Sequence, residues 1–146
     1  MNNKPTNHDS DIQSARKILQ IPIWELKCWG RAWHRFNDEQ LNESLLEVNK
    51  DWQCSIHWHT NRYNCFICIN AIIGVEDFGP AENEPILTNV TIIKEGESFT
   101  IFPKRWHRFY VIQSGRLVEI YWTTNGQACE VDDINRWDIG GKRISS

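Results

Sequence analysis

The residues best able to do chemistry in this chain are three histidines, two of which lie close together in the sequence. His57 and His59 stand within the run Cys54-Ser-Ile-His-Trp-His-Thr-Asn-Arg-Tyr-Asn64. Residues at i and i+2 of a β-strand point to the same face, so both imidazoles project together and form half of a metal site. A third histidine, His107, closes a β-rich run that opens at Gly96. If the two runs lie side by side in a sheet, three imidazoles converge.

The order and spacing of these two runs resemble the motifs of the cupin superfamily. The first cupin motif has a glycine, His-x-His, a glutamate and a closing glycine, and the second has a glycine, Pro-x-Gly, a histidine and an asparagine. All three histidines match, but the glutamate, the Pro-x-Gly pair and the asparagine do not. The motif positions hold Asp51, His57, His59, Asn64 and Ala71 in the first run, and Gly96, Phe102, Lys104, His107 and Val111 in the second, with Pro103 displaced.

A second resemblance, spread over residues 24–140, is to small sugar isomerase and sugar-nucleotide-associated cupins such as lyxose isomerase. Its residues are Lys27-Cys-Trp-Gly30, Phe99 to Phe109, Val118-Glu-Ile-Tyr-Trp122 and Asp132-Asp-Ile-Asn-Arg136. The two resemblances together imply a cupin double-stranded β-helix, or jelly roll, that binds a metal and acts on a sugar. They also imply a homodimer, because small cupins generally pair through their sheet edges.

The residue pattern independently predicts one all-β domain. From Ile23 onward, short β-type runs are separated by turn residues such as Asn125-Gly126, which favours a sandwich or a barrel. Before that point, Ile12, Ala15, Ile18 and Leu19 have helical spacing, so we expect a short amphipathic helix over residues 9–19. We expect residues 1–8 to be disordered and residues 9–146 to form a single cupin domain.

Composition narrows the partners and the compartment. The 146 residues include 16 basic and 19 acidic side chains and have a formal net charge of -3, which argues against a nucleic-acid partner. No run approaches the ~20 apolar residues that a membrane span needs, and no signal peptide is visible. The five cysteines, an odd number, suggest reduced thiols rather than a disulfide framework. We therefore expect a cytoplasmic protein whose partner is a small-molecule substrate.

The three histidines, with Asn64 at the place of the cupin glutamate, form the predicted metal site. Three neutral imidazoles suit a divalent ion such as Mn, Zn, Ni or Fe and leave positions open for water or substrate. Asn64 is a neutral and poorer ligand than a carboxylate, which leaves the site more positive and weaker. The alternative is a polar pocket in which the histidines only form hydrogen bonds. We interpret His8 and His34, which lack partner spacing, as surface residues.

The predicted catalytic residues lie on the strand that follows Ser114-Gly115. Strand alternation places Leu117, Glu119 and Tyr121 on one side, where Glu119 would be the general base and Tyr121 its neighbour in the pocket. The alternative for Glu119 is a structural ion pair with Arg105 or Arg116.

The predicted substrate-binding residues are Lys104 and Arg105. These two cations would lie at the mouth of the barrel, where they would bind a phosphate or carboxylate group of the substrate. The alternative is a solvated turn.

Three functions remain open. The first is a metal-dependent sugar or sugar-phosphate isomerase or epimerase, which the sugar-cupin resemblance implies. The second is a three-histidine non-haem iron dioxygenase, a chemistry that the loss of the glutamate favours. The third is a non-catalytic sugar-binding module.

Overall fold

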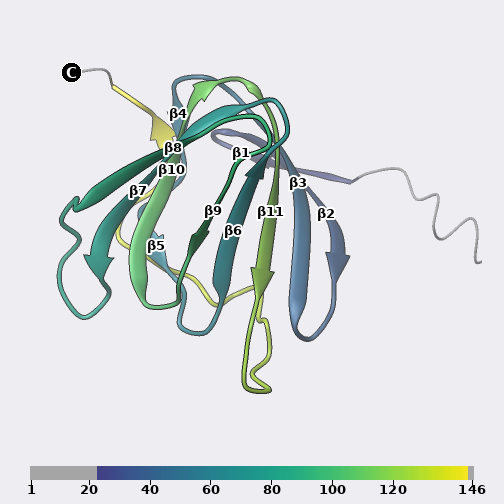
Figure 1. Cartoon of the computed structure of the whole chain (residues 1–146), viewed down its shortest axis with the longest axis vertical. Coiled ribbons are helices and arrows are strands. Elements are labelled where there is room, and N and C mark those ends of the chain that lie inside the picture. Colours follow the sequence, from purple (N-terminus) through teal and green to yellow (C-terminus); the bar gives the residue numbers. More distant parts are fainter. Residues whose placement is uncertain (1–22, 145–146) are drawn as a thin grey trace, which may run out of the picture.

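The structure, a computed structural model, describes residues 23–144, which form two β-sheets packed face to face (Figure 1). No helix occurs within these residues, so the all-β prediction is confirmed. The predicted disordered segment 1–8 and the predicted helix 9–19 lie outside this range. None of the described residues belongs to a helix long and apolar enough to cross a membrane.

The first sheet has six antiparallel strands in the order β1-β2-β3-β11-β6-β9. Strands β2, β3 and β11 are its longest members, and β1 and β9 are its edges. The bounds are β1 (Trp24–Lys27), β2 (Gly30–Asn37), β3 (Leu41–Val48), β6 (Tyr63–Cys68), β9 (Ser98–Ile101) and β11 (Gly115–Trp122).

The second sheet has seven strands built around β10. Strand β10 pairs with β7 along one side, and with β5 and β4 along the other; β7 also pairs with β8, β5 with β12, and β4 with β13. The bounds are β4 (Trp52–Gln53), β5 (His57–Trp58), β7 (Ile72–Pro80), β8 (Asn89–Ile93), β10 (Arg105–Gln113), β12 (Asn135–Arg136) and β13 (Gly141–Lys142).

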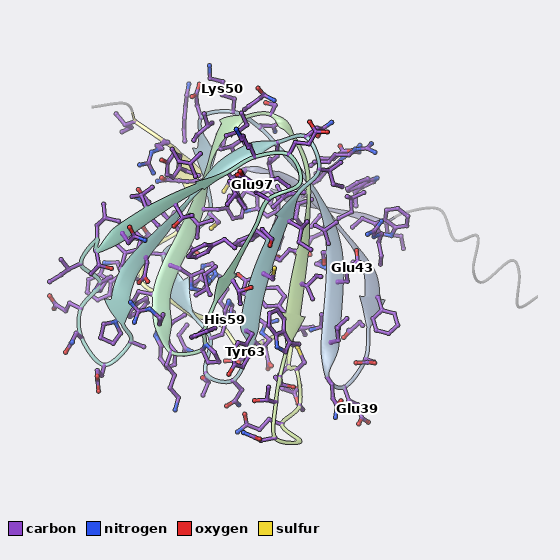
Figure 2. All side chains as sticks on the ribbon, viewed as in Figure 1. Glu39, Glu43, Lys50, His59, Tyr63 and Glu97 are labelled. Atoms are coloured by element: carbon purple, nitrogen blue, oxygen red, sulfur yellow. The ribbon has the colours of Figure 1, made fainter. Side chains whose placement is uncertain are left out.

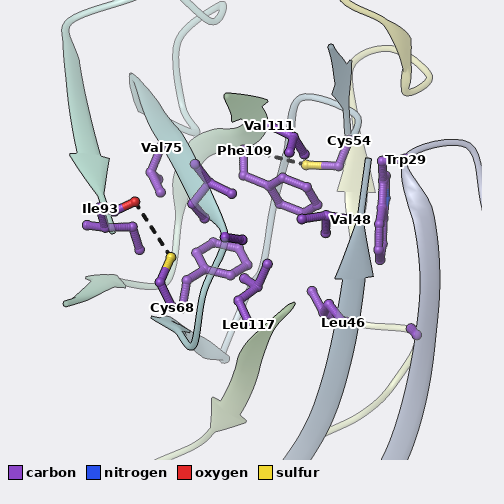
Figure 3. Packing of buried hydrophobic residues seen from close by; sticks show 14 of the residues in the cluster. Trp29, Leu46, Val48, Cys54, Cys68, Val75, Ile93, Phe109, Val111 and Leu117 are labelled. Atoms are coloured by element: carbon purple, nitrogen blue, oxygen red, sulfur yellow. Dashed lines mark hydrogen bonds between the residues drawn. The ribbon is translucent and has the colours of Figure 1, made fainter. Parts of the chain in front are cut away.

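The hydrophobic core fills the space between the two sheets (Figure 3). Phe66 from the first sheet meets Phe109 from the second edge to face, with ring centroids 5.5 Å apart. Trp29 packs against the other side of Phe109 at 5.2 Å. The Phe109 amide donates a hydrogen bond to Cys54 Sγ at 3.2 Å, which ties β10 to the segment before β5. These contacts fix the distance between the sheets at the level just beside the three histidines.

The alternating direction of side chains along the strands places His57 and His107 on the core-facing side. On β10, His107, Phe109 and Val111 are buried together, as predicted for one face of a strand. His57 is buried on β5, whereas the Trp58 ring packs against Trp106 on the outer face, with centroids 6.2 Å apart. The predicted orientation of the His-x-His segment is therefore confirmed.

The C-terminal segment, residues 131–144, returns to the second sheet beside β5 and β4. Arg136 of β12 pairs with His57, and Asn135 pairs with Trp58. Further along, β13 pairs with β4 through Gly141 and Gln53. The last described residues therefore extend the sheet that carries two of the histidines.

A buried carboxylate, Glu76 on β7, holds this returning segment in place. Glu76 is 2% exposed and accepts hydrogen bonds from Arg108 Nε at 2.5 Å and from an Arg143 NH2 nitrogen at 2.8 Å. The Arg143 guanidinium also lies 3.7 Å from the centre of the Tyr110 ring. Burial raises the pKa of Glu76, but the hydrogen bonds from Arg143 and Arg108 outweigh it, so the pKa is lowered overall.

We expect Glu76→Gln to lower the free energy of unfolding by about 3–5 kcal/mol, because it leaves two guanidinium groups beside a neutral amide. Urea unfolding at pH 7 measures the change, and Glu84→Gln, on an exposed loop residue, is the matched control. Because the folded pKa of Glu76 is depressed, its contribution is present above its ordinary pKa and is lost as the pH falls below it. A loss below about 1 kcal/mol in Glu76→Gln would contradict the assigned role.

Candidate metal centre and cavity

The three histidines form one buried cluster at an end of the barrel. His57 and His107 are direct partners in the β5–β10 pairing, and His59 follows β5 on the same face. One potential ligand atom from each side chain lies within 4.8 Å of the other two. The ring centroids are 4.5 Å apart for His57 and His107 and 5.0 Å for His57 and His59. Figure 2 shows His59 at the same end of the barrel as Tyr63.

Each imidazole is oriented by a hydrogen bond from Nδ1 to a backbone carbonyl. The acceptors are Ser55 for His57 at 2.7 Å, Asp133 for His59 at 2.6 Å and Arg105 for His107 at 2.9 Å. A carbonyl can only accept, so each Nδ1 carries the proton and each Nε2 keeps its lone pair. Nε2 of His59 and of His107 is buried and has no hydrogen-bond partner among residues 23–144. This donor set fits a divalent cation.

Burial also keeps the imidazoles uncharged at neutral pH. Desolvation and the neighbouring His107 lower the pKa of His59 to about 3, and desolvation lowers that of His107 to about 4. The pKa of His57 lies well below its ordinary value for the same reasons, since it faces both other rings. Neutral imidazole is the form that binds metals. The histidines are therefore in the metal-binding protonation state at neutral pH even without a metal.

Asp133 and Arg62 support His59 from the C-terminal segment and the loop after β5. The Asp133 carboxylate accepts hydrogen bonds from the backbone amides of Thr60 at 2.6 Å and Asn61 at 2.9 Å. The backbone carbonyl of Asp133 accepts the hydrogen bond from His59 Nδ1. The buried Arg62 guanidinium donates to the same carbonyl at 2.9 Å and lies 4.1 Å from the centre of the Tyr121 ring. Sequence reasoning missed both residues.

A cavity of about 970 Å³ opens beside the cluster. One wall is the inner face of β2, β3 and β11, and the other comes from residues 54–57 and the returning C-terminal segment. His57 is the member of the cluster that lines it, together with Glu119 and Tyr121. The histidine cluster therefore borders a space large enough for a small molecule.

Glu119 carries its carboxylate into this cavity. Its Oε2 accepts hydrogen bonds from Asn64 Nδ2 at 3.2 Å and from the Tyr121 hydroxyl at 3.0 Å. Burial raises the pKa of Glu119 despite these two bonds, so the group is poised closer to neutrality than an ordinary glutamate. Arg105 and Arg116 pair with Asp77 and Glu47 instead, so the alternative of an ion pair between Glu119 and either arginine is wrong.

Asn64, the residue at the place of the cupin glutamate, contacts Glu119. It is fully buried on the core side of β6 and lies opposite Tyr121 in the strand pairing. Its amide nitrogen is used by Glu119, and its Oδ1 has no partner among the residues that the structure describes. The Tyr121 ring reaches His59 at a centroid distance of 5.1 Å. The predicted role of Asn64 as a ligand stays a prediction.

Lys104 and Arg105 do not line this cavity, and their predicted role as ligands for a charged substrate group stays a prediction. The Arg105 guanidinium makes two hydrogen bonds to Asp77, at 2.9 and 3.0 Å. Lys104 has a left-handed backbone with φ of 61°, and its amide donates to the His59 carbonyl at 2.7 Å. Lys104 thus lies in the turn before β10, and Arg105 is the first residue of that strand.

His34 is an exposed residue, as predicted, but it also borders the cavity and has hydrogen-bond partners that the sequence did not indicate. Its Nδ1 lies 2.8 Å from Ser44 Oγ and its Nε2 lies 2.5 Å from Glu25 Oε2. The signal available in the sequence was the alternation along residues 41–48, which puts Asn42 and Ser44 on the face of Leu46 and Val48. A polar pair on the core-facing side of a strand indicates a cavity.

Comparison with known proteins identifies the fold. By sequence, the chain matches no protein-family model and no curated protein. By structure, it is similar to an RmlC-like cupin from Shewanella frigidimarina, with 12% identity, a TM-score of 0.58 and coverage of 71% of this chain and 86% of that one. The chain has the cupin fold.

Two further cupin-fold neighbours are enzymes of different kinds. A variant of oxalate decarboxylase from Bacillus subtilis is 11% identical with a TM-score of 0.63, covering 80% of this chain and 30% of that one. The nucleoside dehydratase Pac13 from Streptomyces, solved with uridine, is 7% identical with a TM-score of 0.62, covering 81% and 85%. At these identities the cupin likeness concerns the fold, and the residues of this chain must carry any functional argument.

We expect His57→Ala and His107→Ala to lose stoichiometric divalent metal while staying folded, because each removes one of the three clustered imidazoles. Elemental analysis after Zn²⁺ loading and dialysis measures metal content, and circular dichroism reports folding. His34→Ala is the matched control, since His34 also lines the cavity but lies outside the cluster. Full metal content in either cluster variant would disprove the three-histidine site.

We expect the metal-free protein to lose stability as the pH falls from 7 towards 4. The unfolded histidines take up protons near 6.5, whereas the folded pKa is about 4 for His107 and about 3 for His59. Between these values the unfolded state binds more protons, so each histidine removes up to about 1.4 kcal/mol per pH unit on acidification. Urea unfolding with a chelator measures this, and equal stability at pH 7 and pH 5 would contradict it.

Proposed function

We propose that the protein is a metal-dependent enzyme that moves a proton beside the carbonyl group of a sugar, in an isomerase- or epimerase-type reaction. The observation that carries this proposal is the Glu119 carboxylate, which enters the cavity beside the histidine cluster. A positioned carboxylate with a raised pKa is suited to take a proton and return it. The sugar-cupin resemblance of the sequence supports the choice of substrate class.

The metal would be held by His57, His59 and His107. A divalent ion bound there supplies Lewis-acid chemistry, because it polarises a substrate oxygen and stabilises the negative charge that develops on it. Elemental analysis of the purified protein identifies the ion, whether Mn, Zn, Ni or Fe.

The carboxylate of Glu119 is held so that one oxygen is free for the substrate. Both of its hydrogen bonds, from Asn64 and Tyr121, go to Oε2. Oε1 makes none within the described part of the chain, and the residue lines the cavity. Fixing one oxygen sets the direction of the other, which reduces the entropy lost when a proton is transferred. Asn64 and Tyr121 thus act as positioning residues.

The second candidate is a three-histidine iron dioxygenase. It is favoured by the donor set, because no carboxylate belongs to the candidate metal group among residues 23–144. In that case Glu119 would be a neighbour of the site rather than a proton carrier. Elemental analysis separates the two, since iron together with O₂ consumption would support the dioxygenase.

We expect Glu119→Gln to keep the fold and the metal but to lower hydrogen exchange at the carbon next to a sugar carbonyl by at least ~100-fold. The amide keeps the shape of the side chain and cannot accept the proton. The measurement is NMR of candidate aldoses and ketoses incubated with metal-loaded protein in D₂O.

Glu43→Gln provides the matched control. Glu43 lies on the neighbouring strand β3, opposite Ile120, and pairs with Arg35 away from the cavity. This variant should exchange like the parent. Exchange that persists in Glu119→Gln would exclude Glu119 as the base. Absence of exchange in the parent with every sugar would favour the dioxygenase or the non-catalytic binding module.

A further inference from the structure

Two polar residues of β3 face the cavity directly beside the proposed proton carrier. Ser44 is the strand-pairing partner of Glu119, and Asn42 is the partner of Tyr121. Paired side chains on one face of an antiparallel sheet have Cβ atoms about 4.5–5.5 Å apart. All four side chains line the cavity, so its wall carries four neighbouring polar groups: Asn42, Ser44, Glu119 and Tyr121.

Asn42 offers a free hydrogen-bond acceptor. The residue is 7% exposed, and its Nδ2 donates to the Cys129 carbonyl at 3.3 Å. Because that carbonyl can only accept, the amide orientation is fixed with Nδ2 towards Cys129. Oδ1 then has no hydrogen-bond partner in the described range. A buried acceptor without a partner on the wall of a cavity favours a ligand that donates to it.

Ser44 offers a second acceptor through its contact with His34. The Ser44 hydroxyl lies 2.8 Å from Nδ1 of His34, and Nε2 of the same ring lies 2.5 Å from Glu25 Oε2. The hydroxyl donates to Nδ1 when only Nε2 carries a proton and accepts when both nitrogens do, and in either case its oxygen keeps a lone pair for another donor. With Oε1 of Glu119, the wall presents three acceptors in neighbouring positions.

The charges around the cavity are balanced. Three cationic side chains line it, Lys27, Arg62 and Arg136, as do three carboxylates, Glu25, Asp132 and Glu119. Lys27 is paired with Glu25, and Arg62 donates to the Asp133 carbonyl. Arg136 has no ion pair among residues 23–144, so the cavity presents one free cation rather than the cluster that recognises a phosphate.

We propose that Asn42 and Ser44 select an uncharged, polyhydroxylated substrate, a free sugar rather than a sugar phosphate, by accepting hydrogen bonds from its hydroxyl groups. That the bound sugar reacts rests on the proposed function, whereas its binding to Asn42 and Ser44 does not. A sugar whose carbonyl carbon lies at Glu119 would place its next hydroxyl groups along β3. Asn42 and Ser44 would then determine affinity, and Glu119 would determine turnover.

The test measures binding of sugar alcohols, which have hydroxyl groups but no carbonyl to react. Xylitol, arabitol, sorbitol and sorbitol 6-phosphate are titrated calorimetrically into the zinc-loaded protein. At least one neutral polyol should bind, and Asn42→Leu and Ser44→Ala should each raise its Kd at least 10-fold at unchanged metal content. Asn89→Leu and Ser98→Ala, on exposed residues outside the cavity, are the matched controls and should leave the Kd unchanged.

For any sugar that exchanges in D₂O, Asn42→Leu and Ser44→Ala should raise KM more than they lower kcat. Unchanged polyol affinity in both variants, tighter binding of sorbitol 6-phosphate than of sorbitol, or no polyol binding at all would overturn the inference. Each variant has circular dichroism as its folding check, and Ser44→Ala, which removes a single oxygen, decides the matter if Asn42→Leu does not fold. Polyol binding that depends on Asn42, without sugar exchange in the parent, would refute the proposed reaction and leave this inference standing.

Discussion

The structure around the site depends on three hydrogen bonds that run from imidazole Nδ1 atoms to backbone carbonyls. They hold the three imidazoles in one cluster with Nε2 of His59 and of His107 buried, and burial of the rings keeps them uncharged. Two of the carbonyls, of Ser55 and Arg105, each lie two residues before the histidine that donates to them. The third belongs to Asp133, far along the chain. The geometry of the cluster therefore requires both the local strand conformation and the position of the C-terminal segment.

The histidine cluster and the orientation of its strands could be predicted from the sequence, because they follow from a period-two pattern. His57 and His59 share a face, Trp58 points outward, and His107 lies on the buried side of β10 with Phe109. The same alternation correctly put Glu119 and Tyr121 on the cavity side. Side-chain direction along a regular strand is a local property, which a sequence states directly.

The polar contacts between distant segments could not be predicted in this way. Asp133 joins the loop after β5 through backbone amides, and Asp77 pairs with Arg105 across β7 and β10. Such pairs depend on which strands are neighbours and on their register, and many acidic residues could have served as partners. The sequence shows the charges of Lys104 and Arg105, which suggested a substrate-binding role, but it does not show that Arg105 pairs with Asp77.

The carboxylate next to the site, Glu119, does not belong to the candidate metal-binding group, which consists of three histidines. The position that holds a glutamate in the cupin motif holds Asn64, whose amide donates to Glu119 on the neighbouring strand β11. The anion nearest to Asn64 therefore belongs to the cavity wall. It retains its proton more readily than an ordinary glutamate because of burial. An amide at position 64 can donate to this carboxylate, whereas a second carboxylate there would repel it.

The return of the C-terminal segment to His57 and His59 has a consequence for the order in which the protein assembles. A growing polypeptide that ends at residue 131 already contains all three imidazoles, but it lacks the Asp133 carbonyl that orients His59 and the Arg136 strand that pairs with His57. All strands of the first sheet and all residues of the hydrophobic core precede residue 131, whereas β12 and β13 of the second sheet follow it. Metal binding by His59 therefore depends on a segment that follows the core in the sequence, because the tautomer of His59 is not fixed without the Asp133 carbonyl.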